Sequence, residues 1–303
     1  MSFIDICGIA KTFHSPGAVR NVLRDVTLSV DRGEFVSIVG MMGSGKSTFL
    51  KIVSGLLAPD AGTITIAGEP VTGVRPDAAI VFQNYSLLPW FSALENVRLA
   101  VGAAFPGWTK ERQRQQAARH LEAVGLGQAL QRRPGQLSGG MRQRVAIARA
   151  FAIEPAILFL DEPFGALDAL TRESLQQELS RLCAAVERPV TTIMISNSVE
   201  EALLLSDRIL PMTRGPGASL GTPVAVALAR PRSASDLLHD GHAARIRANV
   251  VASLTEDLER SRAAAKPARS AQVVARPFPG RVRGAESPAL RTIPSVADAK
   301  GDR

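Results

Sequence analysis

Short apolar runs rich in β-branched residues recur along the chain, separated by turn residues and by amphipathic segments. A run of about four to eight apolar residues bounded by turn signals is typical of a strand that is buried on both faces. Residues 15–17 are predicted to form a turn between flanking segments. The predicted strands span residues 3–9, 25–30, 34–39, 63–67, 78–82, 156–160, 190–195 and 208–212.

Helices are predicted where apolar positions recur at the helical period between these strands. Ser92-Ala-Leu-Glu and Ser198-Val-Glu-Glu are capping boxes, and each predicts a helix start. The alternation of strands and helices predicts an α/β fold with a parallel sheet. The stretch of about 84–137 lacks clear strands and is predicted to be a helical insertion. The predicted helices span residues 46–55, 92–101, 110–124, 142–153, 170–186 and 198–205.

Residues 40–48 read Gly-Met-Met-Gly-Ser-Gly-Lys-Ser-Thr and fit G-x-x-x-x-G-K-[ST], a loop whose backbone N–H groups surround nucleotide phosphates. Gly43 and Gly45 let the backbone lie against phosphate oxygens. Lys46 supplies a point charge to the β and γ phosphates, and the Ser47 hydroxyl ligates Mg²⁺. A strand before the loop and a helix after it, whose positive end faces the phosphates, support this prediction. We therefore predict ATP and Mg²⁺ as ligands, and as nucleotide-binding residues Gly40, Met41, Met42, Gly43, Ser44, Gly45, Lys46, Ser47 and Thr48.

Asp161 and Glu162 follow a predicted buried strand directly. Open parallel sheets bind their ligands at the carboxyl ends of strands, so this pair is expected beside the phosphate loop. One carboxylate can hold Mg²⁺ while the other activates water for attack on a γ-phosphate.

The composition is that of a globular protein, with 303 residues of which 46% are hydrophobic and 21% charged. The sequence contains no apolar run of about 18 residues that would span a membrane. Its N-terminus lacks the basic start and apolar stretch of a signal peptide. Cys7 and Cys183 form no metal-ligand pattern and suggest a reducing compartment. We therefore expect a cytosolic protein.

The net charge of +8 belongs mainly to the C-terminal end of the chain. Residues 261–303 hold nine Lys or Arg against three Asp or Glu, so residues 1–260 carry only +2. This end is rich in Ala, Pro and Arg and is predicted to be disordered from about residue 261. A solvated tail is the simpler interpretation, and contact with anionic lipid or nucleic acid is the alternative.

Leu137-Ser-Gly-Gly-Met-Arg-Gln-Arg lies between the predicted insertion and the Asp-Glu strand. With this segment, residues 3–240 resemble the ATP-binding cassette of ABC transporters. Gln83 matches the glutamine loop of that family, and Gly165-Ala-Leu-Asp matches its D-loop. The resemblance implies a P-loop NTPase with a RecA-like core sheet, an N-terminal antiparallel β subdomain and a helical insertion subdomain. It places the ATP-binding domain at residues 1–240 and a C-terminal extension at 241–303.

The resemblance also implies a site that is shared between two cassettes. In the family, the Ser-Gly-Gly of the signature lies at a helix N-terminus, which suits an anion, and closes on the γ-phosphate of the opposite subunit. A second cassette is therefore expected, as an identical copy or a related subunit. The implied catalytic residues are Glu162, Gln83 and Asn197. The implied Mg²⁺ ligands are Ser47, Gln83 and Asp161. The implied further nucleotide-binding residues are Phe13, which falls where the family stacks an aromatic ring on adenine, Ser138, Gly139, Gly140 and Asp168.

Several longer segments resemble the corresponding segments of ATP-binding subunits from nitrate, sulfonate and taurine importers. The regions around residues 214–216 and 229–232 look closest to nitrate transport ATP-binding proteins. The other segments are residues 81–90, 133–136 and 202–208. In this branch residues 85–91 receive a cytoplasmic helix of the permease, although their aromatic side chains can equally pack as core. The implied partners are permease subunits and, indirectly, a solute-binding protein, with the chain peripheral on the cytoplasmic face of the inner membrane.

The sequence departs from the family where a His-Asp pair is usual, because it has Asn197-Ser198 there. Ser198 can still cap the following helix. Asn197 can donate a hydrogen bond but cannot carry a proton or a charge. We hypothesise intact ATP binding and weakened turnover, since one lost contact to a transferring phosphoryl group costs on the order of 10²–10³ in rate. Met42 is a second departure, and its side chain is expected to point away from phosphate.

Two alternatives to an importer ATPase remain open. The first is a subunit that binds nucleotide but hardly hydrolyses it and pairs with a competent cassette. Asn197 favours this alternative, whereas Glu162, Gln83 and Lys46 oppose it. The second is a DNA-repair or translation ATPase with the same cassette. Such proteins typically need a long coiled-coil insertion, zinc cysteines or two cassettes, so no specific nucleic-acid partner is expected.

Overall fold

Two sheets hold the strands of this chain in the computed structural model, which describes residues 2–183 and 189–264. The first sheet is antiparallel, in the order β2 (Ala18–Val30), β1 (Ile4–Ser15), β4 (Ala61–Ile66) and β5 (Glu69–Pro70). All neighbours in the second sheet are parallel except its edge pair β10–β9. Its order is β10 (Val224–Ala225), β9 (Arg208–Pro211), β3 (Phe35–Val39), β8 (Thr191–Ser196), β7 (Ile157–Asp161) and β6 (Ala78–Val81). The predicted α/β fold, with its core sheet and N-terminal antiparallel subdomain, is confirmed.

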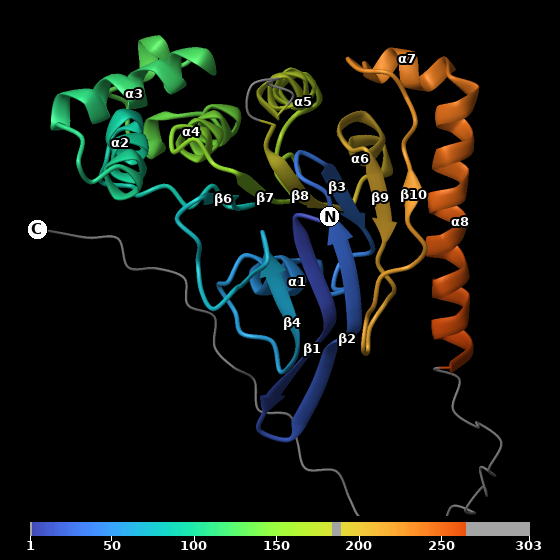
Figure 1. The fold of residues 1–303 in the computed structure, drawn as a ribbon. Coiled ribbons are helices and arrows are strands. Elements are labelled where there is room, and N and C mark those ends of the chain that lie inside the picture. The colour runs from blue at the N-terminus through green and yellow to red at the C-terminus, as the bar shows by residue number, and fades with distance from the viewer. Residues whose placement is uncertain (1, 184–188, 265–303) are drawn as a thin grey trace, which may run out of the picture. The chain divides into compact units, whose positions relative to one another are not determined.

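Different layers cover the two faces of the parallel sheet (Figure 1). On one face α1 (Lys46–Val53) and the antiparallel sheet pack against side chains such as Phe159. The next residue along β7, Leu160, belongs to the core on the other face, with α4 (Gly139–Phe151), α5 (Ala169–Cys183) and α6 (Val199–Leu205). Burial on both faces explains why β7 reads as a continuous apolar run.

The predicted helical insertion lies between β6 and β7 and is drawn in cyan and green in Figure 1. It contains α2 (Ala93–Ala104) and α3 (Lys110–Ala123), which contact each other and α4. Two short 3₁₀ helices, η1 (Gly127–Ala129) and η2 (Pro134–Gln136), lead from α3 to α4. The insertion therefore shares a core with the helix that begins at the signature segment.

Two C-terminal helices, α7 (Ala234–His239) and α8 (Gly241–Ala264), were not predicted. The helix α8 contacts α6, β9 and β10, and it buries Ala243, Ile246 and Val250. These positions follow the helical spacing, but Ala and Arg around them hide the pattern. The boundary at residue 240 stays a prediction. Disorder was predicted from about residue 261. Residues 261–264 belong to α8, and the rest of that stretch, from residue 265 onward, lies outside the described residues.

Both predicted capping boxes are half formed. Ser92 Oγ accepts a hydrogen bond from Glu95 N, and Ser198 Oγ accepts one from Glu201 N. The Glu95 carboxylate binds Arg98 instead of returning to the cap, and the Glu201 carboxylate accepts from Ser196. Each carboxylate thus accepts from another side chain and not from the cap N–H, and only the serine half of each capping box is formed.

The strands β1 and β2 extend well beyond the predicted residues 3–9 and 25–30. They pair as a long hairpin whose predicted turn lies between Ser15 and Ala18. The added residues mix polar and apolar types and, apart from the buried Val22 and Leu23, are exposed or only partly buried, so no regular apolar pattern reveals them. The predicted helix 170–186 ends at Cys183, and its last residues lie outside the described part of the chain. Within the described residues, every helix is too short or too polar to cross a bilayer.

Candidate functional site

The loop between β3 and α1 holds the predicted phosphate-binding residues. Gly43 and Gly45 have φ values of +80° and +103°, which side chains rarely adopt. A Cβ at Gly45 would lie 2.9 Å from Val22 Cγ1, so a side chain there would also clash with β2. Gly45 caps α1 without a side-chain hydrogen bond. The first N–H groups of α1 therefore have no side-chain acceptor at the cap and suit an anion.

Lys46 is 4% exposed, and three acceptors surround its ammonium group. Its Nζ donates to Gly40 O at 2.8 Å, to Met41 O at 3.0 Å and to Asn197 Oδ1 at 2.8 Å. Burial lowers the pKa of Lys46 below its ordinary value, while the carboxylates of Glu162 and Asp161 act in the opposite direction. The loop thus holds one buried cation at the place where phosphate charge is expected.

Ser47 and Asp161 lie side by side at the start of α1 and the end of β7. Ser47 Oγ donates to Asp161 Oδ1 at 3.0 Å. Burial raises the pKa of Asp161, and the hydrogen bond from Ser47 partly offsets it. Hydroxyl and carboxylate oxygens are the donors that Mg²⁺ prefers. Among the described residues no group of three or more His, Cys, Asp or Glu could hold a metal. The pair therefore fits Mg²⁺ that takes its other ligands from phosphate and water.

Glu162 lies one residue beyond β7, with a left-handed φ of +45° that is strained for a residue with a side chain. Two amides hold its carboxylate. Gln83 Nε2 donates to Oε2 at 3.3 Å, and Asn197 Nδ2 donates to Oε1 at 2.7 Å. Because Lys46 can only donate, Asn197 must turn its oxygen toward the lysine and its N–H₂ toward Glu162. Asn197 therefore joins the buried cation to the candidate catalytic carboxylate.

A cavity of about 350 Å³ opens over these groups. Gly43, Gly45, Lys46, Ser47, Thr48, Gln83 and Glu162 line it, as does Met42, whose side chain is 88% exposed. Phe13, which the resemblance assigned to the adenine, is 41% exposed at one wall. The sequence analysis missed Arg20 and Val22, which also line the cavity. Arg20 faces Phe13 across the β1–β2 hairpin, and no motif contains it.

The remaining residues of the loop contribute mainly through their backbone groups. The carbonyls of Gly40 and Met41 accept from Lys46, and the Met41 side chain is 45% exposed. Ser44 is buried. A Cβ at Gly40 would lie 3.0 Å from Met212 O, just after β9, so a side chain there would crowd that backbone.

The signature and D-loop residues do not line the cavity of this chain. Ser138 Oγ accepts from Met141 N and caps α4, with Gly139 as the next residue. A Cβ at Gly140 would lie 2.3 Å from Thr171 Cγ2, so this glycine allows α4 to approach α5. Asp168 Oδ1 accepts from Thr171 N at 3.0 Å, and this bond lowers the pKa of Asp168. Within one chain these residues begin helices.

Comparisons with known proteins agree with this geometry. The family described as ABC transporter matches residues 23–165. Over 249 residues the chain is 47% identical to the nitrate import ATP-binding protein NrtD of Synechococcus elongatus, covering 82% of this chain and 90% of the relative. It is 44% identical to the bicarbonate transport ATP-binding protein CmpD of Synechocystis sp., covering 79% and 84%. A similar solved structure is the dimeric ATP-binding cassette MJ0796 in a post-hydrolysis state bound to ADP and Pi. It superposes with a TM-score of 0.68 and 32% sequence identity, and the match covers 75% of this chain and all of that one.

Proposed function

This chain belongs to the ATP-binding cassette family of ABC transporters, and from that membership we propose that it is the ATPase subunit of an importer for a small anion, with nitrate as the first candidate. The nitrate and bicarbonate relatives are 47% and 44% identical, so bicarbonate is the nearest competitor. Sulfonate and taurine are further candidate solutes, because the sequence segments also resemble importers of these compounds. Residues in the cassette act on nucleotide, so the solute is decided by the proteins with which it assembles.

The contacts of Glu162 carry the proposal of ATP hydrolysis. Its carboxylate accepts from Gln83 and Asn197 at the edge of the cavity over the phosphate loop. A carboxylate held this way can orient a water molecule and accept its proton. Lys46 and the N–H groups of the loop bind phosphate oxygens, and Phe13 offers a ring to the adenine. Ser47, Asp161 and Gln83 would hold Mg²⁺, which when bound neutralises charge on the phosphates.

A second cassette completes the proposed site. Ser138, Gly139, Gly140 and Asp168 lie outside the cavity of their own chain, although the family uses them at the nucleotide. We assign them to the nucleotide held by a partner cassette, identical or related. ATP binding then joins two cassettes, and hydrolysis releases them.

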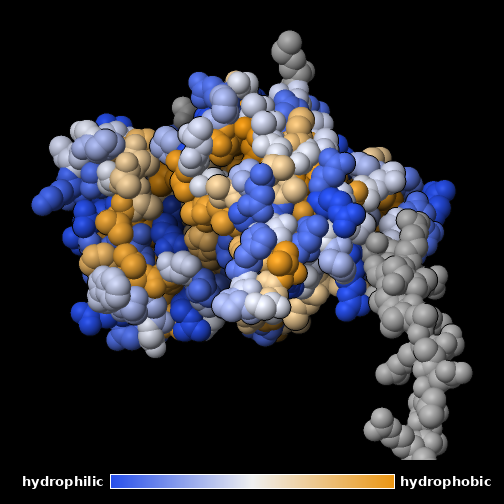
Figure 2. Space-filling view, turned by 90° about the horizontal axis from the view of Figure 1, so that it is seen from below, coloured by the Kyte–Doolittle hydropathy of each residue, from blue (hydrophilic) through white to orange (hydrophobic). Residues whose placement is uncertain are grey.

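The proposed permease contact is the loop of residues 85–91, which leads into α2. Trp90 is 63% exposed, whereas Tyr85 and Leu87 pack partly against the core. Arg149 of α4 donates to the carbonyls of Tyr85 and Ser86 at 2.9 and 2.6 Å, so the base of the loop is anchored. Figure 2 shows apolar side chains bordering a hollow at the left of the molecule, and an exposed apolar surface of this kind is suited to a partner. The chain is then peripheral on the cytoplasmic face of the inner membrane, and a solute-binding protein acts indirectly.

A subunit that binds but does not hydrolyse ATP is less well supported. The observation in its favour is Asn197, which cannot become charged. Against it, Lys46, Gln83 and Glu162 are present and mutually positioned by hydrogen bonds. We therefore retain hydrolysis as the proposed activity.

Glu162→Gln in the full-length chain tests the activity. The variant should bind ATP with a Kd near that of wild type, form dimers with Mg-ATP and lose about 10²–10⁴-fold in turnover, the usual contribution of a general base. Glu173→Gln, an exposed carboxylate on α5, is the matched control and should behave as wild type. Absence of ATP binding or turnover by wild type would contradict the proposal. Uptake of labelled nitrate, bicarbonate and taurine by cells lacking the gene identifies the solute.

A further inference from the structure

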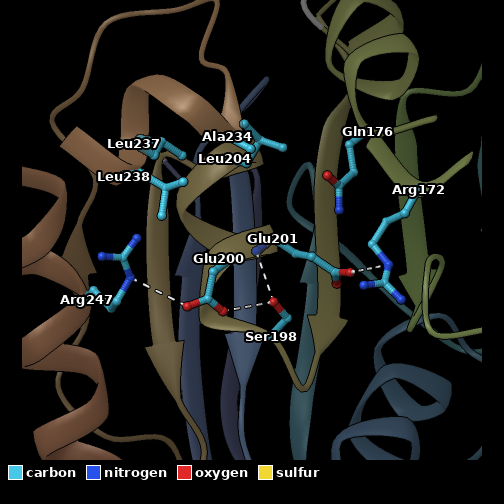
Figure 3. A pocket seen from close by; sticks show the side chains of 10 residues that line it. All are labelled: Arg172, Gln176, Ser198, Glu200, Glu201, Leu204, Ala234, Leu237, Leu238 and Arg247. Carbon is cyan, nitrogen blue, oxygen red and sulfur yellow. Dashed lines mark hydrogen bonds and ion pairs between the residues drawn. The ribbon is translucent and has the colours of Figure 1, made fainter. Parts of the chain in front are cut away.

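A buried carboxylate, Glu201, lies with Ser198 in the wall of a second cavity, of about 340 Å³ (Figure 3). Side chains of α5, α6, α7 and α8 line this cavity. Glu201 is 8% exposed and points toward Arg172 of α5, while its neighbour Glu200 points toward Arg247 of α8. A buried carboxylate is costly unless it is hydrogen-bonded or paired, so its contacts call for an account.

The contacts of Glu201 surround Asn197 on both sides in sequence. Its Oε2 accepts from Ser196 Oγ at 2.6 Å. The same Ser196 Oγ accepts from Ser198 N at 3.0 Å, and Ser198 Oγ accepts from Glu201 N at 3.2 Å. Both neighbours of Asn197 are thereby tied to Glu201, Ser196 through its carboxylate and Ser198 through its backbone N–H. The position of Asn197 between Lys46 and Glu162 depends on this loop.

Arg172 extends these contacts to the D-loop. Its guanidinium donates to Leu167 O at 2.9 Å and to Phe164 O at 3.4 Å. The same group faces Glu201 Oε1 at 3.9 Å, an ion pair in which the carboxylate is the more buried partner. Burial raises the pKa of Glu201, and the charge of Arg172 acts in the opposite direction. Contacts thus continue from the backbone of residues 164–167 to the loop of residues 196–198.

We propose that Glu201 is a positioning residue that holds the Asn197 amide against Lys46 and Glu162, and that Arg172 makes this position respond to the D-loop. The proposal rests on the proposed ATP hydrolysis. A partner cassette that shifts residues 164–168 would move Arg172, and with it the loop that carries Asn197. Glu201 itself touches neither the phosphate-loop cavity nor the reacting groups.

A double-mutant cycle separates this role from a merely structural one. Glu201→Gln should lower kcat about tenfold, as expected for a misplaced side chain, with the Kd for ATP within about twofold of wild type. In an Asn197→Ala background the same change should alter kcat less than about twofold, because the side chain that Glu201 positions is gone. Glu173→Gln, an exposed carboxylate on α5, should alter neither value. An equal loss of kcat in both backgrounds would overturn the proposal.

Hydrogen–deuterium exchange tests the link to Arg172 without any need for turnover. In Arg172→Ala, amide exchange should become faster both at residues 164–168 and at residues 196–201, whereas Glu173→Gln should change neither segment. Faster exchange confined to residues 164–168 would contradict the proposed link. Failure of wild type to hydrolyse ATP would contradict the proposed function instead, and the exchange result would still decide whether Glu201 and Arg172 couple the two loops.

Discussion

The side-chain amide of Asn197 donates a 2.7 Å hydrogen bond to the carboxylate of Glu162. Its oxygen accepts from Lys46 at the same time. A neutral imidazole offers one acceptor and one donor as well, so it could make the same two contacts. What an imidazole adds is the ability to take up a proton near neutral pH. The departure from the family's histidine is therefore a difference in the capacity for charge, and a protonated imidazole would no longer accept from Lys46.

Replacing this amide by imidazole tests whether the charge matters. Asn197→His should raise kcat, by up to about 10², because a positive charge near the γ-phosphate stabilises the transition state. The Kd for ATP should change little, since Lys46 and the loop N–H groups are untouched. Steady-state ATPase rates of the two full-length proteins measure the effect. Equal rates would count against the weakening that we hypothesise.

The contact between Gly140 and Thr171 predicts a specific loss of stability. In Gly140→Ala the new Cβ would lie 2.3 Å from Thr171 Cγ2, so the free energy of unfolding should fall by about 1–3 kcal/mol. Thr171→Ser removes that methyl group, and the double variant should recover most of the loss. Gly135→Ala, whose Cβ meets open space, serves as control. Urea unfolding measures all four proteins, and additive effects of Gly140→Ala and Thr171→Ser would refute the steric explanation.

The buried Glu201 predicts a pH-dependent difference between wild type and Glu201→Gln. Burial raises the pKa of Glu201 above its ordinary value of 4.5, so the folded state binds more protons than the unfolded state between the two pKa values. The contribution of this group to the free energy of unfolding therefore falls as the pH rises through that window. Relative to wild type, Glu201→Gln should become more stable from about pH 4 upward. Urea unfolding over a pH series measures the difference, which should stay constant if Glu201 does not titrate in this way.

The exposed Trp90 predicts a selective loss of assembly. If residues 85–91 receive the permease, Trp90→Ala should weaken the association about tenfold or more, as a central aromatic contact usually does. ATP binding by the isolated chain should be unaffected, because Trp90 does not line the phosphate-loop cavity. Val251→Ala, a similarly exposed apolar residue on α8, is the control. Copurification with co-expressed permease subunits measures the loss, and full recovery of the complex would argue against this docking loop.

Contiguous motifs were the part of the site whose placement in the fold the sequence could predict. The phosphate loop lies within nine residues, and Asp161 and Glu162 follow a buried strand, so the topology of a parallel sheet brings them together. Arg20 and Val22 belong to no motif. They reach the cavity because β1 and β2 pair in a register that the polar hairpin sequence does not reveal.

Glu201 illustrates a different limit. The capping-box pattern predicted its place at the start of α6, and the N–H contact to Ser198 agrees. Its carboxylate, however, binds Ser196 and faces Arg172, which is 29 residues earlier in the chain. A local pattern describes a residue only through its neighbours in sequence. The tertiary structure reveals that the Glu201 carboxylate contacts both the loop of Ser196 and the helix of Arg172. The helix α8 was missed for a related reason, because its small buried face is defined by the strands and helices that it covers.

Arg149 near the end of α4 grips the carbonyls of Tyr85 and Ser86, while Ser138 caps the beginning of the same helix. From Gly139 to Arg149 the helix rises about 15 Å at 1.5 Å per residue. The Tyr85 side chain reaches the other end of this helix, because a Cβ at Gly139 would lie 3.5 Å from its hydroxyl and Arg142 lies over its ring. The proposed permease loop therefore contacts α4 from the signature segment to Arg149.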